Sequence, residues 1–83
     1  MGTPGVLRAV LGHLERGDWQ AAHPLVQQDE EDPLYCWAHG IAHVQEGDLD
    51  NARYWYGEAK RAFPEPYDLK AELLALERAI GPA

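Results

Sequence analysis

One stretch near the middle of the chain, residues 46–64 (EGDLDNARYWYGEAKRAFP), constrains the fold more than any other. Gly47 predicts the end of one helix, because glycine adopts the left-handed backbone at little cost. Asp48 predicts the start of the next helix, because its carboxylate can accept hydrogen bonds from the free N–H groups of a first turn. Small residues and one aromatic then recur on one helix face at spacings of four and three, namely Ala52, Tyr56 and Ala59. The stretch therefore predicts a tightly packed helical hairpin that stops at Pro64.

Apolar residues at the same spacings predict helices on both sides of this stretch. The expected helices cover residues 4–16, 19–28, 33–46, 49–63 and 69–80. Each follows a residue that can cap a first helical turn, and these are Thr3, Asp18, Asp32, Asp48 and Asp68. We expect an all-α fold of about five helices, with two stacked antiparallel hairpins and a C-terminal closing helix. All of it belongs to one domain over residues 1–83, with the first hairpin at 3–28, the second at 33–63 and the closing helix at 68–80.

The charge of the chain argues against several classes of partner. Fourteen acidic and seven basic side chains give a net charge of −7, which repels nucleic acids and anionic membrane surfaces. No apolar run approaches the roughly 20 residues that cross a bilayer. The first residues lack the basic start and apolar run of a signal peptide, and the single cysteine, Cys36, suits a reducing compartment. We therefore expect a cytoplasmic protein whose partner is a protein or peptide.

Two Gly-Asp helix junctions recur along the chain, Gly17-Asp18 and Gly47-Asp48, each followed by an alanine at the same offset. Such repetition of a helix pair is typical of stacked hairpins. Residues 33–64 resemble a tetratricopeptide repeat, and the matching positions are Gly40, Gly47, Asp48, Ala52, Tyr56, Ala59 and Pro64. The N-terminal pair is a degenerate copy that keeps Gly17, Asp18 and Ala22. The chain also resembles a family of small uncharacterised bacterial proteins, through a W-x-x-A-H segment at 19–23 and a G-D-x-x-N-A-x-Y-W-Y segment at 47–56.

The resemblance implies an interaction module that presents a surface to a protein or peptide. Repeats that clamp a peptide carboxylate use Lys and Asn on the groove-lining helix, whereas the matching positions here hold Trp37 and Ile41. The predicted partner surface is aromatic with an acidic rim, and its residues are Trp37, Ile41, Asn51, Tyr54 and Trp55. The three consecutive aromatics at 54–56 span about 200° of a helix, so they cannot all face one neighbour.

A cluster of polar, metal-ligating side chains supports an alternative function, that of a small-molecule or metal-binding protein. Cys36, His39 and His43 are spaced three and four apart and so share one face of a helix, and His23 lies on the preceding helix. Imidazole and thiolate are ligands of zinc and related transition metals. The competing interpretation is a packed polar core, because a tetratricopeptide repeat places core side chains at these positions. No cofactor is expected under the first function, and zinc or another transition metal under the second.

No enzyme activity is expected, because the Cys36–His39 pair lacks a third orienting group and an oxyanion site.

The sequence of the closing helix predicts self-association. Its apolar residues cover more than one stripe, and they are Leu69, Leu73, Leu74, Leu76 and Ile80. Leu73 and Leu74 point about 100° apart, so the second stripe covers either the first hairpin or a second copy of the chain.

Overall fold

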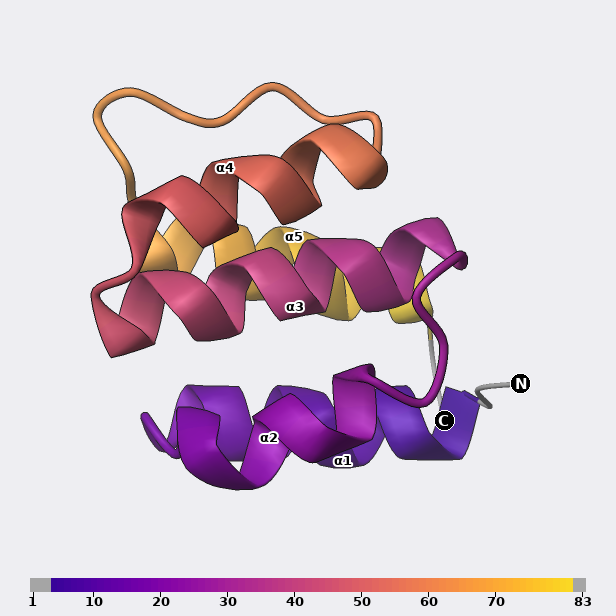
Figure 1. Cartoon of the computed structure of the whole chain (residues 1–83). Helices are drawn as coiled ribbons and strands as arrows, with labels where there is room; N and C mark the ends of the chain where they lie inside the picture. Colours follow the sequence, from indigo (N-terminus) through magenta and orange to yellow (C-terminus); the bar gives the residue numbers. More distant parts are fainter. Residues whose placement is uncertain (1–3, 82–83) are drawn as a thin grey trace.

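The computed structural model describes residues 4–81 and contains five α-helices and no β-strand within that range. The helices are α1 (Pro4–Glu15), α2 (Trp19–Val26), α3 (Pro33–Glu46), α4 (Leu49–Glu58) and α5 (Leu69–Ile80). Helices α1 and α2 form one antiparallel pair, α3 and α4 form a second, and α5 lies behind α3 and packs against both α1 and α3 (Figure 1). The predicted all-α fold is confirmed. Between residues 4 and 81, no helix has the length and apolar character that crossing a membrane requires.

The helices begin where the capping residues predict. The side chains of Asp18, Asp32, Asp48 and Asp68 each accept a hydrogen bond from a backbone N–H two or three residues ahead. Each therefore satisfies a donor that a first helical turn leaves free. Gly47, with φ of 92°, closes α3 in the left-handed conformation that favours glycine. The predicted cap Thr3 lies outside the described residues.

The second hairpin is shorter than predicted, because α4 ends at Glu58 and does not continue to Phe63. Lys60 adopts a left-handed φ of 61°, which turns the chain away from the helix axis. Phe63 then packs its ring against those of Tyr56 and Tyr67, each at a centroid distance of 5.1 Å. The loop after α4 therefore folds back as a cover over Tyr56. Helix α2 likewise stops at Val26, two residues before the predicted end.

Helix α3 is the centre of the molecule, since it contacts all four other helices. Every residue from Tyr35 to His43 is buried, so both faces of the helix belong to the interior. The crossing with α4 is especially close at Gly40. A Cβ placed there would lie 2.6 Å from Cδ1 of Tyr56 and 3.1 Å from the carbonyl oxygen of Ala52. Only glycine permits this approach, and the predicted burial of Ala52 opposite Gly40 is confirmed.

We expect Ala52→Leu to lower the free energy of unfolding by about 1–3 kcal/mol, because three added carbons overpack this crossing. Chemical denaturation followed by circular dichroism measures the change. Ala9→Leu is a matched control, since Ala9 is an exposed position within α1. A mutant at position 52 as stable as the control would contradict the close packing of α3 and α4.

Candidate metal centre

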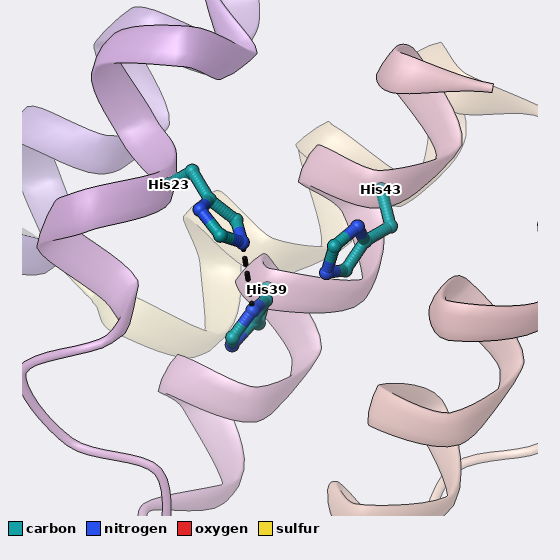
Figure 2. Close-up of side chains that lie close together, drawn as sticks. All are labelled: His23, His39 and His43. Atoms are coloured by element: carbon teal, nitrogen blue, oxygen red, sulfur yellow. Dashed lines mark hydrogen bonds between the residues drawn. The ribbon is translucent and has the colours of Figure 1, made fainter. Parts of the chain in front are cut away.

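Three histidine side chains meet between α2 and α3. His23 projects from α2, while His39 and His43 project from successive turns of α3 (Figure 2). One ring nitrogen from each lies within 4.8 Å of the others, and the ring centroids are 5.0–5.1 Å apart. The convergence depends on the packing of α2 against α3, which brings together residues 16 positions apart in the chain.

His23 and His39 are in hydrogen-bond contact, at a spacing that would also suit two ligands of one ion. Their Nε2 atoms are 3.3 Å apart and no other atom separates them (Figure 2). Two nitrogens bound at 2.0–2.1 Å to a tetrahedral zinc ion are about 3.3–3.4 Å apart. Without an ion, this contact requires that one Nε2 carries a proton and the other a lone pair.

The tautomer of His43 is fixed by a neighbouring carboxylate. Nδ1 of His43 lies 2.7 Å from Oε1 of Glu46, one turn further along α3. A carboxylate only accepts, so Nδ1 donates, and in the neutral ring Nε2 keeps its lone pair for a metal. Histidines that ligate metals commonly donate their second nitrogen to a carboxylate in this way, which orients the ring and raises its basicity.

His39 is held rigidly and kept neutral. Only 2% of the residue is exposed, and its ring stacks on that of Trp55 from α4 at 3.9 Å and 11°. Burial lowers the pKa of His39 to about 3, with further lowering from the nearby His43 and His23. Nδ1 of His39 is buried and has no hydrogen-bond partner among residues 4–81. Buried polar atoms without a partner are uncommon in native proteins. The ring is therefore a neutral imidazole. Its Nε2 faces His23, whereas the unpartnered nitrogen is Nδ1.

Cys36 does not join the histidines, although the sequence placed it on the same face of α3. Its thiol donates a hydrogen bond of 3.3 Å to the carbonyl oxygen of Glu30, in the loop before the helix. Burial raises the pKa of Cys36, and the carboxylates of Glu58 and Asp29 raise it further. A buried thiol that keeps its proton is a poor ligand, because metals bind the thiolate. The candidate site thus contains three of the four predicted ligands.

A second set of ligand atoms lies at the turn between α3 and α4, formed by His43, Glu46 and Asp48. Asp48 is already engaged, because its carboxylate accepts from the backbone and the side chain of Asn51 at 3.3 and 2.6 Å. Glu46 is bound to His43, as described above. Glu46 therefore supports His43, Asp48 is occupied by Asn51, and the set does not form a separate centre.

The predicted partner surface is not one surface, and for Trp37 and Ile41 the prediction is wrong. Both are buried in the core, and Nε1 of Trp37 donates to Glu72 of α5 at 3.1 Å. Asn51 is exposed but bound to Asp48. Trp55 is half-buried against His39, which leaves Tyr54, 56% exposed, as the one aromatic of the set that is open to a partner.

Sequence reasoning missed two residues that hold the histidines in place. Glu46 follows His43 by three positions, a spacing that puts both on one helix face and could have indicated the contact. Trp55 was assigned to a partner surface, and nothing in the sequence indicates that its ring stacks on His39. That contact depends on how α4 crosses α3, which is a property of the whole fold.

The segment that resembles a tetratricopeptide repeat forms the pair α3 and α4. Comparison of the chain with protein-family models, curated proteins and solved structures returns no match. The family resemblance therefore remains a prediction that rests on the residues quoted for it.

Proposed function

We propose that this protein binds a divalent transition metal ion, zinc in the first place, through His23, His39 and His43. The observation that carries the proposal is the convergence of the three rings from two helices. Imidazole nitrogen is a good ligand for zinc, copper and nickel, whereas calcium and magnesium prefer oxygen. Three histidines leave a fourth tetrahedral position for water or another ligand.

The surrounding residues support a ligand role for these rings. Glu46 holds the tautomer of His43, and the stacking of Trp55 fixes the plane of His39. His23 is only half-buried, so an ion can approach from its side. An ion bound here would tie α2 to α3 and would stabilise the fold by mass action, by about 2.7 kcal/mol at a concentration of 100 times Kd.

The proposal predicts micromolar or tighter zinc binding at neutral pH with one ion per chain, measured by isothermal titration calorimetry. The double variant His39→Ala, His43→Ala should weaken binding more than about 100-fold, because it removes two of three ligands. His23→Gln should also weaken binding strongly, because it removes one ligand while it leaves α3 unchanged. His13→Gln is the matched control, because His13 lies on α1 and contacts Arg16.

A further variant tests the supporting carboxylate. Glu46 is exposed, so Glu46→Gln should leave the fold intact while it weakens zinc binding by about 10–100-fold. Two results would reject the metal site: no heat of binding at tens of micromolar zinc, or equal affinity in the wild type and in His23→Gln. The three histidines would then be a packed polar core.

Protein or peptide binding is the second candidate function, and the exposure of Tyr54 favours it. Tyrosine supplies a large contact area with a polar end, which is common at interfaces. The metal site has the stronger geometric support, because all five residues proposed for the partner surface are buried or already in contact with other side chains, Tyr54 through its edge contact with Trp55.

A further inference from the structure

A groove between the C-terminal end of α1 and helix α5 lies on elements that contribute nothing to the histidine site. It has a volume of about 450 Å³, and its lining residues are Glu15, Leu69, Lys70, Leu73, Leu74 and Glu77. Leu74 is 46% exposed and lines this groove. Leu73 also packs against the core, so it connects the groove to the interior.

The charges of this groove have a definite order along α5. Lys70 and Glu77 stand on either side of the adjacent pair Leu73 and Leu74, and the four residues lie within about 100° of one helix face. The residues three and four positions after Lys70 are Leu73 and Leu74, and the same two leucines lie four and three positions before Glu77. Within α5, therefore, neither charge has an oppositely charged neighbour at the spacing that stabilises helices.

We propose that this face binds the same face of a second copy of the chain, with the two α5 helices antiparallel about a two-fold axis between Leu73 and Leu74. Lys70 of each copy then lies opposite Glu77 of the other, and the exposed leucines meet at the centre. A two-fold interface requires a surface that is complementary to itself. On α5, one positive and one negative charge placed symmetrically about an apolar centre meet that requirement, and Glu15 of α1 lines the same groove.

The size of the face predicts a weak dimer. A helix of 12 residues is about 18 Å long, so the contact is smaller than the roughly 800 Å² per partner of a stable complex. The net charge of −7 on each copy adds long-range repulsion that salt screens. We therefore expect a dissociation constant on the order of tens of micromolar at physiological salt, where salt screens both the net repulsion and the Lys70–Glu77 pairs.

Charge reversal tests the register of this dimer, with sedimentation equilibrium as the readout. Lys70→Glu and Glu77→Lys should each weaken self-association by about tenfold or more, because like charges then face each other twice. An equimolar mixture of the two variants should form a heterodimer, and the double variant should regain the wild-type association. Glu77→Lys lowers the net negative charge, so a loss of dimer in this variant separates specific pairing from general repulsion.

A second pair of variants tests the apolar centre. Leu74→Asp should abolish the dimer, whereas Leu49→Asp should retain it, since Leu49 is equally exposed but lies on α4. Circular dichroism confirms that each variant is folded. The proposal is overturned if the wild type is monomeric at high and low salt up to hundreds of micromolar. It is also overturned if the mixed variants do not associate or if Leu49→Asp alone breaks the dimer.

Discussion

Replacing Tyr56 by alanine is expected to lower the free energy of unfolding by about 3–5 kcal/mol, a large part of what a chain of this size has. The Tyr56 ring is buried, fills the space that Gly40 leaves on α3, and lies edge-on to the ring of Phe63. Its hydroxyl donates to Oε1 of Glu72 at 2.5 Å and lies 2.7 Å from the hydroxyl of Tyr67. The mutation would therefore open a cavity and break the link from α4 to α5 at once.

Urea denaturation of three variants separates these contributions. Tyr56→Phe keeps the ring and should cost only about 1–3 kcal/mol for the lost hydroxyl and the unsatisfied groups around it. Tyr54→Ala is the matched control on the same helix, and it should change stability by about 0.5 kcal/mol or less because Tyr54 is exposed. A Tyr56→Ala protein as stable as Tyr54→Ala would show that the ring does not hold the hairpin together.

The fold was predictable because its signals are local. A cap is an interaction between residues two or three apart, and the four described aspartate caps all form as expected. The end of α4 was not predictable in the same way. Residues 59–63 continue the helical pattern, but Phe63 gains more by packing on Tyr56 and Tyr67 than by extending the helix. The end of α4 therefore depends on residues outside the helix, including Tyr67, which follows Pro64 and Pro66.

The candidate site was predictable in part, and for the same reason. Helical spacing correctly placed His39 and His43 on one face, and the preceding helix supplied His23. Spacing could not show that Cys36, one turn earlier, lies beside the loop at Glu30. It also could not show that α5 covers the outer side of α3, where Trp37 reaches a residue 35 positions away. Contacts between distant segments decide which neighbour each side of a central helix packs against.

The buried hydroxyls of Tyr56 and Tyr67 predict that the protein loses stability in alkaline solution. Burial raises the pKa of Tyr67 to about 12, and the negative charge of Glu72 adds to this. Burial raises the pKa of Tyr56 as well, together with its hydrogen bond to Glu72. In the unfolded chain both hydroxyls lose their protons near pH 10. Between pH 10 and 12 the folded state therefore holds more protons than the unfolded state, and stability falls as the pH rises.

The expected loss from Tyr67, which is partly exposed to solvent, is about 1–2 kcal/mol across this window, and Tyr56 adds to it. Urea denaturation at pH 8, 10 and 11.5 measures the slope. Tyr67→Phe should be less stable than the wild type at pH 8, and the difference should shrink as the pH rises, because phenylalanine has no proton to lose. Tyr54→Phe is the control, and its difference from the wild type should stay constant. If Tyr67→Phe and Tyr54→Phe show the same dependence on pH as the wild type, the tyrosine hydroxyls are not held in a buried network with Glu72.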